Sequence, residues 1–326
     1  EGKPPIVKRK CEIERIAEGC IDIRRTTGQH PGGIVVLPIG EEIHSFTPVQ
    51  HPANDMTTSI VTTHFDYHSI DHNLLKLDIL GHLDPTMIRM LQDLTGIDPL
   101  EIPLDSKEVM SLFQNTSALG IKPEDIGGTK LGALGIPEFG TDFAMQMLMD
   151  TKPQYFSDLV RIAGLAHGTD VWLGNAQTLI KEGKATISTA ICTRDDIMIY
   201  LIQKGLDSEE SFKIMEMVRK GKVASGKCKE WPEFKKDMAE HNVPDWYVWS
   251  CEQIKYMFPK AHAAAYVMMA YRIAYCKINY PLAYYGAYFG IRADAFSYEI
   301  MCQGKEKLQY YIDDYNRRSA TLSKKE

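Results

Sequence analysis

The hydrophobic periodicity of this 326-residue chain changes near residue 100, and this change limits its fold more than any other feature. Before that point, short apolar or β-branched runs at 34–37, 57–63 and 74–80 lie between turn residues, as strands do. After it, apolar residues recur at helical spacing, most clearly over the alanine-rich stretch 261–278. We therefore predict a mainly α protein, with a helical domain over 101–326 preceded by a small α+β portion over 1–100.

One helix of the first portion is well marked at both ends. Asp84 can cap the free amides of a first turn, and Pro85 suits the first helical position because no donor is needed there. Gly96 is placed to end the helix, and the residues between carry one apolar face. The sequence therefore predicts a helix from Asp84 to just before Gly96.

Composition excludes several classes of protein. No run approaches 18 uncharged apolar residues, so a membrane-spanning segment is not expected. The seven cysteines are widely spread and form no CxxC pair, which argues against a disulfide framework or a cysteine-rich zinc site and indicates reduced thiols in the cytoplasm. The chain begins without methionine and ends on Lys324-Lys325-Glu326, so we expect a segment of a longer protein.

Charge is unevenly distributed along the chain. The net charge of −6 argues against a generally basic nucleic-acid-binding protein. Residues 213–236, however, contain eight basic and three acidic residues. This stretch suggests a surface that faces phosphate, although a solvated helix end, where the dipole favours cations, accounts for part of it equally well.

Three histidines, His64, His68 and His72, are spaced four residues apart. On a helix they would lie on one face, in the arrangement of metal ligands. The flanking residues 59–63 favour a strand instead, where residues four apart lie roughly 13 Å from one another. Histidines of a polar core or an active-site wall are therefore favoured, and a metal-dependent hydrolase stays as an alternative.

The run Lys76-Leu77-Asp78 places a lysine and a carboxylate on the same face of a predicted strand. A strand-borne carboxylate suits a Mg²⁺ ion, and the lysine could offset phosphate charge. From the local pattern alone, a salt bridge on the strand face is the favoured interpretation.

A glycine-rich stretch at 24–33 contains Arg25 and His30 and precedes a predicted strand. Glycines with nearby cations can hold a phosphate, yet the spacing matches neither GxGxxG nor the P-loop. A tight turn is equally plausible for this stretch.

The segment 256–266 is the most distinctive of the chain. Pro259 marks a helix start, and Lys260 lies in the first turn, where the dipole disfavours a cation unless an anion is bound. His262 and Tyr266 are four residues apart and share one face. A lysine for phosphate and aromatic rings for stacking are typical of nucleotide-binding sites.

Six strings in this order, RTTGQHPGG, THFDYHSIDHNLLKLDILGHLDPT, IPEFGTDF, HGTDVWLGNAQ, RDDIMIYLI and YMFPKAHAAAY, resemble the PolC-type DNA polymerase III α family, the C-family replicative polymerases of low-GC Gram-positive bacteria. The resemblance covers essentially the whole chain. It implies that residues 1–100 are the later part of a palm domain and that 101–326 are the fingers. The implied function is addition of deoxynucleotides to a primer 3′ end.

The resemblance also implies roles for particular residues. Asp78 matches the third catalytic aspartate of the family, which binds one of two Mg²⁺ ions, and Lys76 matches its neighbouring lysine. Arg25 and His30 fall in a palm motif near the active site. The implied nucleotide contacts are Arg194, Arg219, Lys220, Tyr256, Lys260 and His262, to which the shared helix face adds Tyr266.

The chain departs from the family pattern because it contains no Asp-x-Asp. The other two catalytic carboxylates are therefore absent, and we expect the chain alone not to polymerise DNA. The expected partners are deoxynucleoside triphosphates, primer–template DNA and, through regions outside this chain, the sliding clamp and other replisome subunits. A non-catalytic helical module that binds DNA or a protein partner is the remaining alternative.

Overall fold

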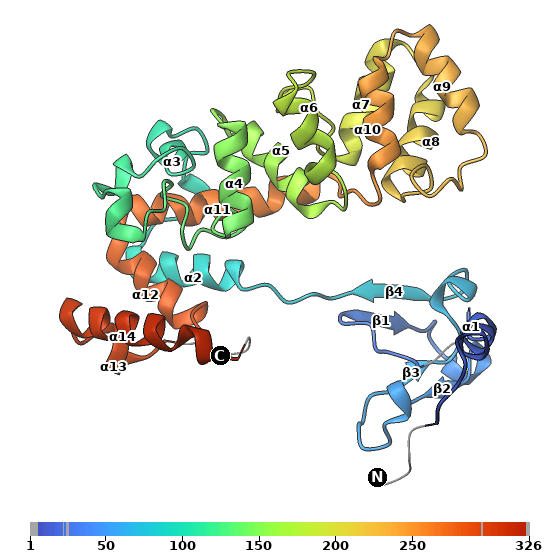
Figure 1. Ribbon diagram of the computed structural model, residues 1–326, viewed down its shortest axis with the longest axis horizontal. Coiled ribbons are helices and arrows are strands. Elements are labelled where there is room, and N and C mark those ends of the chain that lie inside the picture. Colours follow the sequence, from blue (N-terminus) through green and yellow to red (C-terminus); the bar gives the residue numbers. More distant parts are fainter. Residues whose placement is uncertain (1–5, 22, 24–25, 295, 324–326) are drawn as a thin grey trace. The chain divides into compact units, whose positions relative to one another are not determined.

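The computed structural model describes residues 6–21, 23, 26–294 and 296–323 (Figure 1). Its contacts divide the chain into two compact units, Glu1–Gly81 and His82–Glu326. Each unit is described by itself. Among the described residues, no helix is both long enough and apolar enough to cross a bilayer.

Among its described residues, the first unit has one α-helix and four short strands. These are α1 (Lys10–Gly19), β1 (Gly33–Val36), β2 (Val49–Gln50), β3 (Thr62–Thr63) and β4 (Leu75–Asp78). β1 pairs antiparallel with β4, and β2 pairs antiparallel with β3. The predicted strands around 34–37 and 74–80 are confirmed, whereas only two residues of the predicted strand 57–63 are in a strand.

This unit has almost no hydrophobic core. Among its described residues only Thr47 and Leu74 are buried, while Ile34, Leu75 and Leu77 are largely exposed. These apolar side chains share one face of the two-stranded sheet, and that face is uncovered within the unit. Because a sheet usually needs a covering layer for stability, the unit has the character of an incomplete domain.

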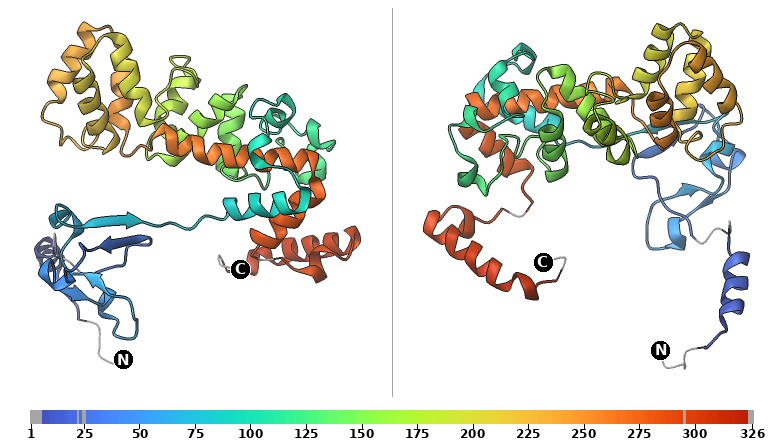
Figure 2. Two further views of the ribbon diagram at one scale, coloured as in Figure 1. Left: turned by 180° about the vertical axis from the view of Figure 1, so that it is seen from behind. Right: turned by 45° about the horizontal axis from the view of Figure 1, so that its top comes forward.

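The second unit is helical, which confirms the predicted mainly α class (Figure 2). Its helices are α2 (Asp84–Thr95), α3 (Lys107–Ser111), α4 (Asp142–Thr151), α5 (Phe156–His167), α6 (Gln177–Lys181), α7 (Arg194–Lys204), α8 (Ser208–Arg219), α9 (Trp231–Glu240), α10 (Asp245–Gln253), α11 (Lys260–Asn279), α12 (Pro281–Ile291), α13 (Tyr298–Met301) and α14 (Lys305–Arg318).

The 20-residue helix α11 is the central element of this unit. It packs against α2, α3, α5, α7 and α12. Ala263, Val267, Ala270 and Ala274 are fully buried along it, and their small size allows the neighbouring helices to approach closely. The alanine-rich sequence thus makes both the helix and the contacts around it.

Helix α2 belongs to the second unit, not to the first. Met87 and Leu91 are buried in a cluster with Ile273 of α11 and Tyr284 of α12. The contacts therefore divide the chain after Gly81, earlier than the predicted boundary at residue 100. Local sequence patterns group α2 with the strands just before it. They do not reveal its packing partners, which lie almost 200 residues further along the chain.

Of the two end signals predicted for α2, the one at Gly96 is confirmed and the capping role of Asp84 is wrong. Gly96 ends the helix with a φ of 74°, in the left-handed region that favours glycine. Asp84, however, is the first helical residue and does not cap the helix, since the residue before it, Leu83, occupies the N-cap position. Its buried carboxylate instead accepts a hydrogen bond from Arg292, beyond the end of α12.

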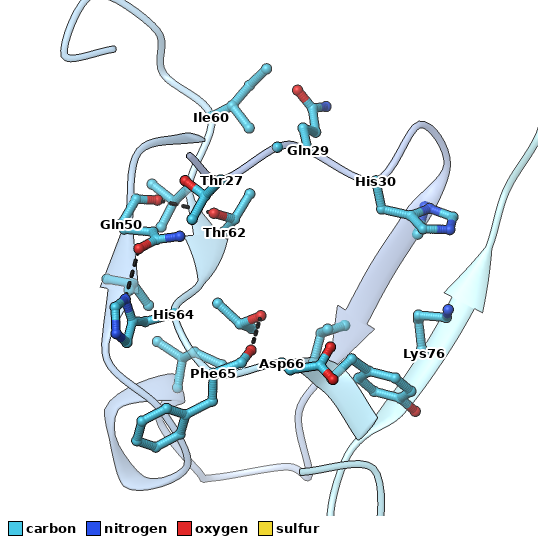
Figure 3. A pocket seen from close by; sticks show the side chains of 18 of the residues that line it. Thr27, Gln29, His30, Gln50, Ile60, Thr62, His64, Phe65, Asp66 and Lys76 are labelled. Atoms are coloured by element: carbon cyan, nitrogen blue, oxygen red, sulfur yellow. Dashed lines mark hydrogen bonds between the residues drawn. The ribbon is translucent and has the colours of Figure 1, made fainter. Parts of the chain in front are cut away.

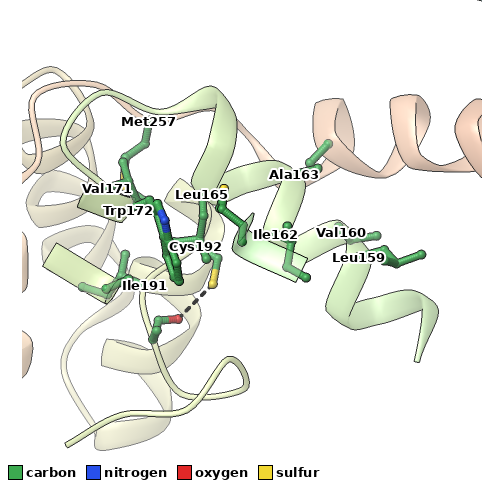
Figure 4. Packing of buried hydrophobic residues seen from close by; sticks show 14 of the residues in the cluster. Leu159, Val160, Ile162, Ala163, Leu165, Val171, Trp172, Ile191, Cys192 and Met257 are labelled. Atoms are coloured by element: carbon green, nitrogen blue, oxygen red, sulfur yellow. Dashed lines mark hydrogen bonds between the residues drawn. The ribbon is translucent and has the colours of Figure 1, made fainter. Parts of the chain in front are cut away.

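A large buried cluster joins α5, the turn after it and the loop before α7 (Figure 4). Trp172 and Cys192 pack here with Leu165 and Met257, all nearly inaccessible to solvent. All seven cysteines are free thiols, and burial raises the pKa of Cys192 well above its ordinary value. This cluster fixes the ends of several helices that carry predicted site residues.

Gly164 of α5 permits a close helix contact, and Gly164→Ala is expected to destabilise the chain. A Cβ at this position would lie 2.6 Å from Thr193 Cγ2 and 2.7 Å from the Cys192 carbonyl oxygen. Overpacking of this kind costs about 1–3 kcal/mol.

Gly286→Ala in α12 is the control, because a Cβ there has no neighbour within 4 Å. That variant should gain about 0.5–1 kcal/mol from helix propensity. Urea denaturation measures both, and equal stability of the two variants would contradict this packing argument.

Candidate nucleotide-binding and catalytic residues

The segment 255–258, just before α11, is held by backbone hydrogen bonds from three directions. Thr169, after α5, donates its N–H to Tyr256 O (2.9 Å) and accepts from Lys255 N (3.1 Å). The carbonyl of Arg219, at the end of α8, accepts from Met257 N at 3.2 Å. The N–H of Arg194, at the start of α7, donates to the carbonyl oxygen of Phe258 at 3.1 Å. The structure therefore brings Arg194, Arg219 and Tyr256 together from distant parts of the sequence.

Lys260 begins α11, and its amino group is paired. Its Nζ lies 2.8 Å from Asp196 Oδ1, and its backbone N–H donates to Asp195 Oδ2 at 2.6 Å. The negative charge that the helix dipole favours at this end comes from two carboxylates at the start of α7. The side chain remains 44% exposed, so an external anion can reach it.

Arg219 and Lys220 share a single carboxylate. Both side chains pair with Glu216, Lys220 Nζ at 2.8 Å and Arg219 through two hydrogen bonds. The hydrogen bond from Arg219 is the main reason that the pKa of Glu216 falls to about 2, and Lys220 adds to it. These two cations are therefore already neutralised in part within α8 and its C-terminal turn.

The remaining basic residues of 213–236 differ in their pairing. Lys213, Lys235 and Lys236 each lie within 4 Å of a glutamate. In the part of the chain that the structure describes, Lys222, Lys227 and Lys229 have no ion-pair partner. All three lie between α8 and α9, which places the free positive charge of the stretch in that connection.

Aromatic rings and histidines follow one another along the start of α11. Tyr256, 43% exposed, packs edge-on against Phe258, whose ring stacks on His262 with centroids 5.0 Å apart. The ring of His262 in turn contacts that of Tyr266, with centroids 4.6 Å apart. Burial lowers the pKa of His262, and neighbouring His167 adds to the effect. A neutral imidazole suits stacking better than phosphate binding.

Sequence reasoning missed three residues of this cluster. Phe258 lies between Tyr256 and His262, and His167, at the end of α5, contacts Phe258, His262 and Tyr266. Glu138, before α4, accepts a hydrogen bond from His167 Nε2 at 2.6 Å. Glu138 and His167 stand in the strings IPEFGTDF and HGTDVWLGNAQ, which indicated a resemblance but no role.

In the first unit, Asp78 ends β4 with two basic side chains beside it. Lys76 Nζ lies 3.6 Å and His30 Nε2 3.8 Å from Asp78 Oδ1. His30 is oriented by its Nδ1, which accepts hydrogen bonds from the N–H groups of Gly32 and Gly33. The proton of a neutral His30 therefore sits on Nε2, toward Asp78. The carboxylate is about half exposed and open to further ligands.

Gly33 of β1 stands opposite Asp78 in the strand pair. A Cβ on Gly33 would lie 2.8 Å from His30 Nδ1 and 3.3 Å from Asp78 Oδ1. The absence of a side chain thus leaves room for His30 and Asp78 to approach. Arg25, the other predicted residue of this stretch, lies outside the described residues.

A cavity of about 750 Å³ opens in the first unit. His30 and Lys76 line one side of it, and His64 with Gln50 lines the opposite side (Figure 3). His64 Nδ1 is 2.7 Å from Gln50 Oε1, and His72 is almost fully exposed beside Asp71. His64, His68 and His72 do not form a metal-ligand group among the described residues. The intervening residues form a short 3₁₀ turn, in which ligands four apart do not align.

The structure thus places a strand carboxylate beside a lysine in the first unit, and it gathers cations and aromatic rings in the helical unit. The profile of the bacterial DNA polymerase III alpha subunit finger domain matches residues 84–242, and that of the bacterial DNA polymerase III alpha NTPase domain matches residues 5–81. The chain belongs to the bacterial DNA polymerase III alpha family. The junction between the two matched stretches coincides with the division between the two units.

Individual relatives give the same result over nearly the whole chain. The chain is 56% identical over 321 residues to the DNA polymerase III PolC-type of Clostridium perfringens, and 56% identical over 318 residues to that of Bacillus subtilis. Each match covers 98% of this chain but 22% of the relative. The chain thus spans about a fifth of the length of these relatives.

Proposed function

We propose that this chain supplies part of the active site of a replicative DNA polymerase, which adds deoxynucleotides to a primer 3′ end. The observation that carries the proposal is the position of Asp78, at the end of β4 with Lys76 and His30 beside its carboxylate. The 56% identity to PolC-type polymerases supports the same reaction. In the terms of that family, the first unit belongs to the palm and the helical unit is the fingers.

Asp78 would bind Mg²⁺ in a two-ion site that clamps the primer 3′-hydroxyl and the triphosphate. Its exposed carboxylate fits a hard cation, and Lys76 offsets charge on the phosphates. One carboxylate cannot hold two ions, and the chain contains no Asp-x-Asp. Further ligands must therefore come from other parts of a longer polymerase, which agrees with the uncovered sheet of the first unit.

The helical unit would bind the incoming nucleotide around the segment 255–258. Lys260 and the pair Arg219 and Lys220 would exchange their carboxylate partners for phosphate oxygens, and Arg194 would add a fourth cation. The exposed ring of Tyr256 would contact the base, with His262 and Tyr266 behind it. Primer–template DNA, and the clamp and replisome subunits bound through other regions, complete the proposed partners of this cytoplasmic enzyme.

A second candidate function is binding of DNA without catalysis. The unpaired cations Lys222, Lys227 and Lys229 favour it, because free lysines on a connection between helices can contact phosphates of either strand. Binding that falls with salt and does not depend on nucleotide would support this function for the chain by itself.

The isolated 326-residue chain is expected to incorporate no nucleotide on a primed template, whereas a full-length polymerase that contains it should do so. The reason is the lack of the further carboxylates that two Mg²⁺ ions require. Radiolabelled dNTP incorporation measures both proteins under the same conditions. Incorporation by the isolated chain would contradict the proposed division of the active site. An inactive full-length protein would contradict the proposed function itself.

A further inference from the structure

A group of potential metal ligands lies wholly within the helical unit. His82 precedes α2, Asp84 is the first residue of α2, and Glu138 lies before α4. One ligand atom of each residue lies within 4.8 Å of those of the other two. His82 Nε2 and Asp84 Oδ2 are 3.3 Å apart. One imidazole and two carboxylates therefore converge on a single point.

Each of the two carboxylates is fixed through one oxygen by a basic side chain. Arg292 donates to Asp84 Oδ1, while Asp84 Oδ2 faces His82. His167 donates to Glu138 Oε2, and Glu138 Oε1 has no hydrogen bond among the described residues. Metal-binding carboxylates are commonly held in this way by an outer partner, which sets their orientation.

The surroundings of the group suit a cation. The Asp84 side chain is 2% exposed and that of Glu138 19%, so two negative charges lie close together with little water. A cation between them would offset their repulsion. His82 is the most exposed of the three at 31% and leaves a path from solvent. Glu138 has a φ of 68°, a conformation that costs a non-glycine residue of order 1–3 kcal/mol.

We propose that His82, Asp84 and Glu138 bind one divalent transition-metal ion of the Zn²⁺ or Mn²⁺ type, with water completing its coordination. An imidazole together with two carboxylate oxygens suits these ions better than Mg²⁺, which prefers oxygen ligands alone. Arg292 and His167 act as outer partners. The ion joins α2, the loop before α4 and, through Arg292, the end of α12. This site does not include Asp78, and it adjoins the proposed nucleotide-binding residues, because His82 and the outer partner His167 both contact Tyr266.

The chain, freed of metal with a chelator, is titrated with Zn²⁺ and separately with Mn²⁺ by calorimetry. Wild-type protein should bind one ion, and its melting temperature should rise with that ion, because binding to the folded state stabilises it. His82→Ala and Glu138→Gln should each weaken binding at least ~10-fold, and His167→Ala about 10-fold as an outer partner. His72→Ala is the matched control, since His72 is almost fully exposed beside Asp71, and it should bind as wild type does.

The proposal is overturned if wild-type chain binds neither ion at millimolar concentration and shows no change in melting temperature. It is equally overturned if His82→Ala and Glu138→Gln bind as tightly as wild type, or if His72→Ala loses binding to the same extent. Circular dichroism verifies that each variant is folded. Should Glu138→Gln not fold, His82→Ala decides alone, because the exposed position of His82 tolerates truncation.

Discussion

Asp78→Asn in a full-length polymerase that contains this chain is expected to reduce nucleotide incorporation at least ~10³-fold while primer–template binding changes little. The substitution keeps the shape of the side chain but removes the negative charge that binds Mg²⁺. A metal ion contributes several kcal/mol to stabilisation of the transition state, and about 4 kcal/mol corresponds to a thousandfold in rate. Single-turnover incorporation and DNA binding by fluorescence anisotropy measure the two effects separately.

The structure offers a matched control for this substitution. Asp71 lies in the same unit, outside the β1–β4 pair, and the imidazole Nδ1 of His72 lies 3.4 Å from its carboxylate. Asp71→Asn should leave incorporation unchanged. Because the Asp78 side chain is about half exposed, its replacement by Asn should not unfold the unit. Turnover close to wild type in Asp78→Asn would remove the assignment of this aspartate as a metal ligand.

The helical part of the fold could be predicted from the sequence because its signal is local. Apolar residues at helical spacing define α5, α8 and α11, and small residues on α11 indicate close packing. The strands were harder to predict. Residues 57–63 are mostly β-branched, yet only Thr62 and Thr63 pair, since their partner β2 is itself two residues long. The length of a strand depends on its partner, which a local pattern does not contain.

The contacts of the candidate site likewise fall into those that the sequence predicts and those that it does not. The dipole argument at Lys260 predicted a bound anion at the start of α11, whereas in the structure Asp195 and Asp196, 65 and 64 residues earlier, supply negative charge there. Lys76 and Asp78 could be paired from strand alternation alone. Glu138 and His167 could not, because their contact joins a loop to the end of a helix 29 residues away. Local spacing predicts contacts within an element, whereas contacts between elements require the packing.

Lys260→Ala is expected to raise the KM for dNTP roughly tenfold in the full-length polymerase and to change kcat less. A hydrogen bond between a charged lysine and phosphate is worth about 1.5–3 kcal/mol, but Lys260 must first leave Asp196, so the net loss lies at the lower end. Lys184→Ala is the matched control. Lys184 is an exposed lysine that also pairs with a carboxylate, Glu182 at 2.7 Å, and it lies outside the segment 255–258 and the stretch 213–236. Steady-state kinetics over a range of dNTP concentrations compare the two variants. A similar KM in both would show that Lys260 serves only to join α7 and α11, and an equal fall in kcat and kcat/KM would indicate a contact made in the transition state alone.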